Sequence, residues 1–149
     1  MMTKGLVVAI ALLGAAPASA ATPKCGFTAK QVVEKFSQLF FIEKRPVEAY
    51  QLWVAPDYVQ HNPIATDGRD AAIKALGPIF AANPDLKVDI KRIIGDDTHV
   101  AVHYHSVMKP GTKGFAAVDM FRVENCKIVE HWDVIQPMPD KSANDHPMF

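Results

Sequence analysis

The chain has 149 residues, of which 16 are basic and 16 are acidic, so its formal net charge is zero. This length suits one domain with a substantial core and is too short for two such domains. Because there is no excess of basic residues and the aromatic residues do not alternate with a basic stripe, we expect neither a nucleic-acid partner nor binding to anionic membranes.

The first 20 residues have the three parts of an export signal. Met1 to Lys4 give a short positive start, Gly5 to Ala16 form an apolar segment too short to span a bilayer, and Ala18-Ser19-Ala20 is a small-residue cleavage site. We predict a cleaved signal peptide over residues 1–20 and a single mature domain over residues 21–149; an uncleaved anchor is the alternative. The mature protein is expected to be periplasmic or secreted, without a stable membrane anchor.

Three helices are predicted in the first half of the mature chain. Thr28 and Gln31 have the spacing of a capping box, and the helix that follows ends at Arg45. Pro46 suits the first turn of a second helix, which runs to about Trp53. A third helix follows Asp67-Gly68 and ends at Asn83-Pro84, with a kink or an interruption expected at Gly77-Pro78. The apolar stripe of the first helix consists of Val32, Val33, Phe36, Leu39 and Phe40.

The second half of the chain alternates apolar and polar residues with period two, which is typical of strands. The predicted strands are a short early one over Tyr58–Asn62 and then Leu86–Ile94, Thr98–Met108, Phe115–Val123 and Lys127–Gln136. Three helices followed by an antiparallel meander predict an α+β fold. A curved sheet wrapped against helices would leave a concave pocket.

The turn between the last two strands decides which side chains share a face of the sheet. A two-residue turn at Asn125-Cys126 would place Asp119 opposite Trp132. A three-residue loop over Glu124–Cys126 would place Asp119 opposite His131, and we favour this arrangement. It requires Cys126 to adopt a left-handed conformation that normally favours glycine.

The preceding connection places histidines beside the same aspartate. Lys109 to Lys113 is an odd number of residues, so pairing Met108 with Gly114 would put His103 opposite Asp119. His103, Asp119 and His131 would then stand side by side on three neighbouring strands. Such an arrangement can hold, donate and accept protons near neutral pH.

The predicted catalytic set is completed by two further residues, and a second set is expected to bind substrate. His105 and Asp133 lie one pleat away from His103 and His131 on the predicted face. Because Tyr58, Gln60 and Asn62 share a parity, they are expected at the pocket mouth. The predicted substrate-binding residues are Tyr58, Gln60, Asn62 and Phe121.

Two other kinds of function remain open from the residues. The pocket could bind a small apolar molecule without catalysis. Alternatively, zinc could be bound by His103, His105, His131 and an aspartate. No closely spaced ligand motif such as H-E-x-x-H occurs, so no metal and no cofactor are predicted. Val100, Val102 and Tyr104, placed on the opposite face from the histidines, are expected to support a homodimer.

Cys25 and Cys126 both lie after the predicted cleavage site. Because an exported protein meets an oxidising environment, we predict a disulfide between them; two free thiols are the alternative. A bridge that closes a loop of about 100 residues would stabilise the fold by roughly 4 to 5 kcal/mol on the chain-entropy model. That gain could offset backbone strain at Cys126.

Three sequence segments resemble a known family. Residues 119–136 read DMFRVENCKIVEHWDVIQ, residues 58–63 read YVQHNP, and residues 67–70 read DGRD. Together they resemble the SnoaL-like polyketide cyclases of the nuclear transport factor 2-like superfamily, although that family usually has glycine where Cys126 stands. The resemblance implies a cone-shaped α+β barrel. It also implies cofactor-independent chemistry on a small carbonyl compound, in which a proton is removed beside the carbonyl before an aldol-type ring closure or an isomerisation.

The resemblance also implies roles for single residues. Asp119 stands where a similar ketosteroid isomerase has its oxyanion-hole acid, but Asn62 stands where that enzyme has its general base, and an amide cannot take a proton. Asp133 stands where a similar limonene epoxide hydrolase has an acid, but His103 and His105 replace the arginine and aspartate of its charged triad. Of the chemistries of this fold, the SnoaL type therefore fits best, with Asp119 and His131 transferring protons.

Overall fold

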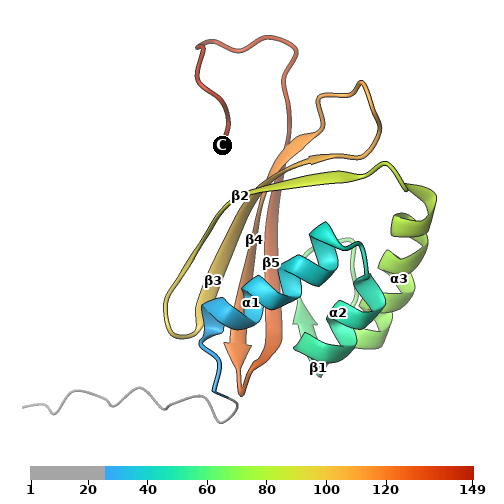
Figure 1. Cartoon of the computed structure of the whole chain (residues 1–149), viewed down its shortest axis with the longest axis vertical. Coiled ribbons are helices and arrows are strands. Elements are labelled where there is room, and N and C mark those ends of the chain that lie inside the picture. The colour runs from blue at the N-terminus through green and yellow to red at the C-terminus, as the bar shows by residue number, and fades with distance from the viewer. Residues whose placement is uncertain (1–25) are drawn as a thin grey trace, which may run out of the picture.

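A computed structural model describes residues 26–149. Within them, three helices cover one face of a five-stranded sheet, so the predicted α+β class and cone-shaped architecture are confirmed (Figure 1). The predicted signal peptide over residues 1–20 lies outside the described residues. No helix in residues 26–149 is long and apolar enough to cross a membrane.

The first two helices begin where the sequence predicts. In α1 (Ala29–Ser37), the Gln31 backbone N–H donates to Thr28 Oγ1 at 3.2 Å, and the Thr28 N–H donates to Gln31 Oε1 at 2.9 Å, which completes the capping box. α1 continues into a π-helical turn, η1 (Gln38–Ile42). α2 (Pro46–Trp53) has its proline in the first turn, where the missing N–H breaks no hydrogen bond.

The third helix, α3 (Arg69–Ala82), runs on through Pro78 instead of ending there. A proline inside a helix leaves the carbonyl four residues earlier, here that of Lys74, without its usual donor. None of the residues of α3 is fully buried, so water can reach this exposed helix and hydrate a freed carbonyl. Of the two expectations at Gly77-Pro78, the interruption is therefore wrong, and the kink stays a prediction.

The strands form one mixed sheet in the order β1-β5-β4-β3-β2. β1 runs parallel to β5, while the other neighbouring pairs are antiparallel and form the predicted meander. The strands are β1 (Val54–Gln60), β2 (Lys87–Gly95), β3 (His99–Val107), β4 (Phe115–Glu124) and β5 (Lys127–Pro137).

The early strand is longer than predicted at its start and shorter at its end. β1 begins at Val54, directly after α2, and includes Pro56. Proline is tolerated because β1 is an edge strand, where one side of the backbone needs no donor. β1 ends at Gln60, so Asn62 belongs to the loop that follows. Gln60 pairs with His131 of β5, which brings these two side chains next to each other.

The predicted register between β3 and β4 is wrong by one residue. Ser106 pairs with Phe115, so an even number of residues (107–114) lies between these two paired positions, and Asp119 lies opposite Val102 instead of His103. Gly114 explains the shift. It has a φ of 71°, and a Cβ there would lie 1.9 Å from the Ser106 carbonyl oxygen. Only glycine can adopt this conformation so close to the backbone of β3.

The turn between β4 and β5 also differs from the favoured prediction. Glu124 pairs with Lys127 around a two-residue turn in which Asn125 and Cys126 have φ values of 47° and 60°. Both values are positive, as a type I′ hairpin requires, which confirms the predicted left-handed Cys126. β5 then has one extra residue. This bulge returns the side chains of β5 to the faces that the predicted three-residue loop would have given them. As a result Asp119 lies opposite Asp133, not opposite His131 or Trp132.

Cys126 is buried, and its Sγ lies 3.6 Å from the carbonyl oxygen of Phe27. The hairpin turn is therefore packed against the segment that leads into α1. Cys25 lies outside the described residues, so the disulfide between Cys25 and Cys126 stays a prediction.

The core lies between α1 and the inner face of the sheet. Phe36 is 1% exposed and is surrounded by aromatic rings of η1, α2 and β4. Val100, Val102 and Tyr104 are also buried on this inner face, so their predicted place on the outer face is wrong. The correction follows from the shifted register of β3, because a slip of one residue exchanges the two faces of a strand.

Candidate functional site

A cavity of about 480 Å³ lies between the helices and the inner face of the sheet. This volume is within the usual range for pockets that hold small molecules. Most of its lining is apolar and comes from α1, η1, α3 and the ends of β2 and β3. Its polar side chains are concentrated on β4 and β5, with additional ones from the end of β1 and the loop after it.

The centre of the polar wall is a pair of buried titratable residues. Asp119 of β4 is 6% exposed and His131 of β5 is 8% exposed. His131 Nε2 lies 3.7 Å from Asp119 Oδ1. The Tyr104 hydroxyl, on β3, donates a hydrogen bond to the same Asp119 oxygen at 3.3 Å. The aspartate is thus held between a phenol and an imidazole.

Burial raises the pKa of Asp119, because a carboxylate loses hydration in this cavity. His131 and Tyr104 act in the opposite direction through hydrogen bonding, while the negative charge of Asp133 raises the pKa further. Asp119 therefore keeps its proton at a higher pH than an ordinary aspartate does. Burial also raises the pKa of Tyr104, so its hydroxyl stays neutral and remains a donor.

Gln60 connects His131 to two buried tyrosines, Tyr58 and Tyr50. Gln60 Oε1 lies 2.9 Å from His131 Nδ1 and accepts from the Asn62 backbone N–H at 2.9 Å. Gln60 Nε2 donates to the Tyr58 hydroxyl at 3.1 Å, and Tyr58 is hydrogen-bonded to Tyr50. Tyr58 is 1% exposed and is not among the residues that line the cavity, so it supports Gln60 from behind.

Asn62 holds Asp133, the second acidic residue of the wall. Its Nδ2 donates to both carboxylate oxygens of Asp133, at 2.9 and 2.7 Å, and its Oδ1 accepts from the Ile64 backbone N–H at 3.0 Å. Gln60, Asn62 and Phe121 all line the cavity, as their predicted role requires. Contact with a substrate stays a prediction for these three residues.

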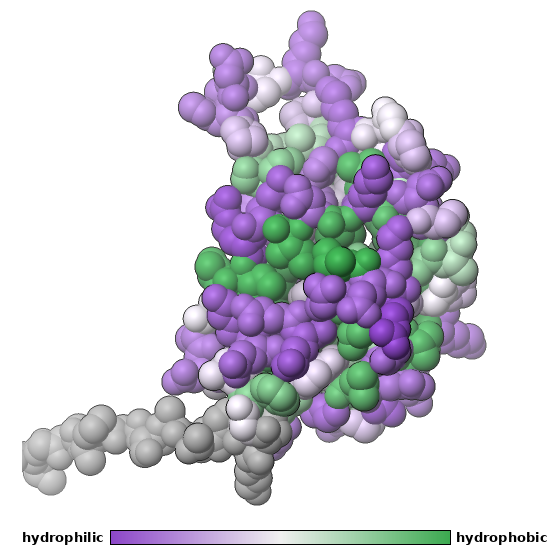
Figure 2. Space-filling model, viewed as in Figure 1, coloured by the Kyte–Doolittle hydropathy of each residue, from purple (hydrophilic) through white to green (hydrophobic). Residues whose placement is uncertain are grey.

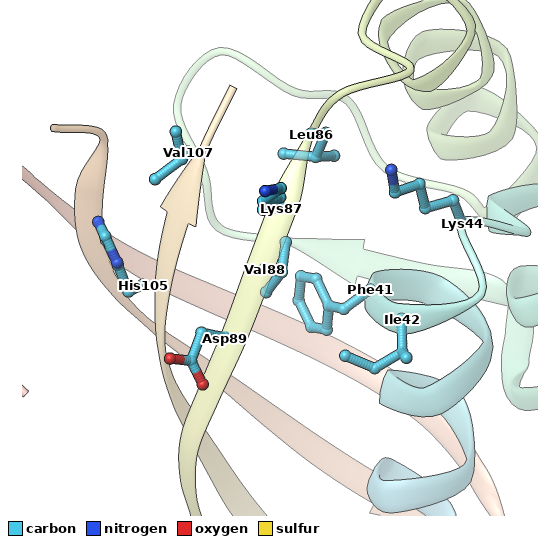
Figure 3. A pocket seen from close by; sticks show the side chains of 9 residues that line it. All are labelled: Phe41, Ile42, Lys44, Leu86, Lys87, Val88, Asp89, His105 and Val107. Atoms are coloured by element: carbon cyan, nitrogen blue, oxygen red, sulfur yellow. The ribbon is translucent and has the colours of Figure 1, made fainter. Parts of the chain in front are cut away.

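His103 and His105, by contrast, do not join the site. The corrected register puts them on the outer face of β3, away from Asp119. His105 Nε2 lies 2.7 Å from the Lys113 carbonyl oxygen, and its ring stacks on that of Phe149 at a centroid distance of 4.7 Å. Figure 3 shows His105 on the side of β2 away from Phe41. The predicted triad of His103, Asp119 and His131 on one face is therefore wrong.

A second hollow, also of about 480 Å³, lies outside the cavity and borders the edge strand β2. Figure 2 shows apolar surface between α1 and β2, where Phe41, Ile42 and Val88 contribute to this hollow (Figure 3). Two of its charged groups are engaged elsewhere, since Lys44 Nζ donates to the Pro84 carbonyl and Asp89 pairs with Lys91. The buried pair of Asp119 and His131 lines the inner cavity instead.

Sequence reasoning missed Tyr104, which touches Asp119 directly. The signal was present in the alternation of Val100, Val102 and Tyr104, which is the apolar face of β3 and would be expected to point inward. Reading the faces from loop length instead of from this alternation assigned Tyr104 to the outer surface. Tyr50 of α2 also lines the cavity.

Three donors of the polar wall could in principle bind a metal ion. Asp119, His131 and Asp133 each offer one ligand atom, and these atoms lie within 4.8 Å of one another. Both oxygens of Asp133 also accept from the Asn62 amide. The other predicted zinc ligands, His103 and His105, lie on the opposite face and cannot complete this set.

Comparison with known proteins identifies the family. The model of the SnoaL-like domain matches residues 33–131. This chain belongs to the SnoaL-like family. No curated protein matches the sequence of this SnoaL-like chain. The match extends from α1 to His131, so it includes Gln60, Asn62, Asp119 and His131 but not Asp133.

Solved structures share the fold of the SnoaL-like chain. A proposed SnoaL-like polyketide cyclase from Jannaschia sp. CCS1 is 17% identical over 72% of this chain and 86% of its own, with a TM-score of 0.57. IdmH, a proposed polyketide cyclase from Streptomyces antibioticus, is 20% identical over 70% and 88%, with a TM-score of 0.55. An NTF2-like protein of unknown function from Cytophaga hutchinsonii is 15% identical over 74% and 92%, with a TM-score of 0.60.

Proposed function

We propose that this protein is an acid–base catalyst without a cofactor, acting on a small apolar carbonyl compound in the inner cavity. The observation that carries the proposal is the buried Asp119, held by Tyr104 and facing His131 in a mostly apolar pocket. A carboxyl that keeps its proton can donate to a carbonyl oxygen, and a neutral imidazole can remove a proton from carbon.

The proposed reaction begins with enolisation. His131 takes a proton from the carbon beside the substrate carbonyl, and the electron pair of that C–H bond forms the enolate. Asp119 donates its hydrogen to the enolate oxygen, where the negative charge develops. In an aldol-type cyclisation, the enolate carbon then bonds to a second carbonyl carbon of the same molecule. The new alkoxide takes the proton from His131, and Asp119 recovers its own. In an isomerisation, His131 returns the proton to a different carbon.

The similar proteins support this reaction class, since two of them are named as proposed polyketide cyclases. We also propose that the protein is exported to the periplasm or secreted, on the basis of the N-terminal signal in the sequence. A homodimer remains part of the proposal. After the register correction, the exposed apolar side chains available for it on the outer face include Met120 and Val134.

Deuterium exchange tests the proposed function without knowledge of the natural substrate. A panel of aromatic and alicyclic ketones is incubated with the protein in D₂O, and NMR follows the loss of the protons beside each carbonyl. We expect catalysed exchange for at least one ketone that binds, because a proton on His131 exchanges with solvent before it returns to carbon. If ketones bind in the cavity and none exchanges faster than without protein, the catalytic proposal fails.

Binding of ketones without catalysed exchange would support a non-catalytic binding module. One observation favours this alternative: the polar groups of the wall satisfy one another without a ligand. Asn62 bonds both oxygens of Asp133, and Gln60 bonds both Tyr58 and His131. A pocket of this kind could hold an apolar molecule and leave it unchanged.

A further inference from the structure

The hydrogen-bond partners of Gln60 determine which way its amide points. The backbone N–H of Asn62 lies 2.9 Å from the Gln60 oxygen, and a backbone N–H can only donate. A reversed amide would bring two donors together at this distance. Its nitrogen, in the orientation found, donates to the Tyr58 hydroxyl at 3.1 Å. The oxygen of Gln60 must therefore face Asn62.

That orientation assigns the proton of the neighbouring imidazole. The same Gln60 oxygen lies 2.9 Å from His131 Nδ1. An amide oxygen only accepts, so Nδ1 must carry a hydrogen for this contact to be a hydrogen bond. In the neutral ring, the other nitrogen then has a lone pair in place of a hydrogen. This nitrogen, Nε2, is the one that lies 3.7 Å from Asp119 Oδ1.

We infer that Gln60 is a positioning residue that holds His131 in the Nδ1–H tautomer and leaves Nε2 as the base of the site. The sequence predicted substrate binding for Gln60, whereas its amide is used by the protein itself. Three parts of the fold make the device: Gln60 ends β1, Asn62 follows it in the loop, and His131 pairs with Gln60 from β5. The tautomer depends only on these contacts, but its catalytic use rests on the proposed function.

The chemical consequence is a pair of groups that hold a single movable proton. With Asp119 protonated and Nε2 unprotonated, one group can donate to a substrate oxygen while the other accepts from carbon. The opposite tautomer would present an N–H to Asp119 and direct the lone pair toward Gln60, where no substrate can reach it. Losing the Gln60 acceptor should therefore lower the rate of the proposed reaction about 10-fold to 100-fold, by analogy with the range found for partners that orient a metal-binding imidazole.

The tautomer can be read directly from ¹⁵N-labelled protein by long-range ¹H–¹⁵N NMR, at a pH where the His131 ring is neutral. His131→Gln identifies the resonances by their loss. We expect Nδ1 to be protonated and Nε2 to be unprotonated in the wild type. Gln60→Met keeps the size of the side chain but removes the acceptor, and a mixture containing Nε2–H is expected. Gln60→Glu restores an acceptor and should restore the wild-type tautomer.

Each result is decisive for the inference. A wild-type ring protonated at Nε2, or a Gln60→Met ring that keeps only Nδ1–H, would overturn it. If Gln60→Met does not fold, the wild-type spectrum alone decides. Deuterium exchange is read separately: in an active protein, Gln60→Met should lower kcat with little change in KM. The expected tautomer without any exchange would keep the inference and reject the proposed function.

Discussion

Replacing Asp119 by asparagine is expected to lower the rate of deuterium exchange beside the substrate carbonyl about 100-fold to 10,000-fold, the usual range for a lost acid–base group. Asparagine keeps the shape of the side chain. It can accept from Tyr104 and donate to His131, both of which contact Asp119. It cannot give up a proton to the enolate oxygen. NMR with a ketone that the wild-type protein deuterates measures the effect.

Asp89→Asn is the matched control, because it removes a carboxylate whose side chain is 65% exposed and paired with Lys91 outside the cavity. This variant should exchange the ketone at the wild-type rate. An Asp119→Asn protein that retained the full rate, with the ketone still bound in the cavity, would remove Asp119 from the mechanism.

Loss of the fold should not explain the loss of rate in Asp119→Asn. Since burial raises the pKa of Asp119, the folded state binds this proton more tightly than the unfolded chain does. As the pH rises from the ordinary value of 3.8 through the folded pKa, the unfolded chain releases its proton first, so the wild-type protein loses stability. Asparagine has no such dependence. Above this window, the variant is expected to be at least as stable as the wild type.

Phe36→Ala is expected to lower the free energy of unfolding by about 3 to 5 kcal/mol, the usual cost of removing a buried aromatic ring. The ring of Phe36 is 1% exposed, and its centroid lies 5.2 Å from that of Phe40, 5.4 Å from that of Tyr50 and 5.5 Å from that of Phe121. Its loss would leave a void where α1, η1, α2 and β4 meet. Denaturant unfolding followed by circular dichroism measures the change.

Ile64→Ala provides the comparison for Phe36→Ala, because Ile64 is 93% exposed. A surface truncation of this kind should change the free energy of unfolding by no more than about 0.5 kcal/mol. Equal losses from the two variants would mean that Phe36 is not part of the core. Phe36 also lines the cavity, so ligand affinity should change together with stability.

The helices and the antiparallel meander of the last four strands could be predicted because their signals are local. The capping box of Thr28 and Gln31, the proline at the start of α2 and the period-two alternation each depend on a few neighbouring residues. The fold follows from the sequence of these elements. One local signal was misjudged in part, since Gly77-Pro78 does not interrupt the exposed helix α3.

The faces of the strands were harder to predict, because one residue in a connection exchanges them. For β3, the conformation of Gly114 leaves an even number of residues between the paired positions of β3 and β4, where an odd number was predicted. This shift moved His103 and His105 out of the site. For β5, two departures cancelled. The two-residue turn reversed the predicted faces, and the bulge near Val129 reversed them again.

This cancellation explains why three of the five predicted catalytic residues lie together on one face. Asp119, His131 and Asp133 share the inner face even though the predicted pairing of Asp119 with His131 was wrong. The roles of Gln60 and Asn62 could not be read from the sequence, because they arise from the parallel pairing of β1 with β5, which are distant in the chain.

¹³C NMR can show whether Asp119 is a buried acid that keeps its proton in the pocket. Protein labelled at the aspartate side-chain carboxyl carbons is titrated with pH, and Asp119→Asn identifies the resonance of Asp119. We predict that this carboxyl stays protonated at a pH well above 3.8, the ordinary value for aspartate, and ionises only later. Ionisation at or below the ordinary value would contradict the proposed role of Asp119 as the acid.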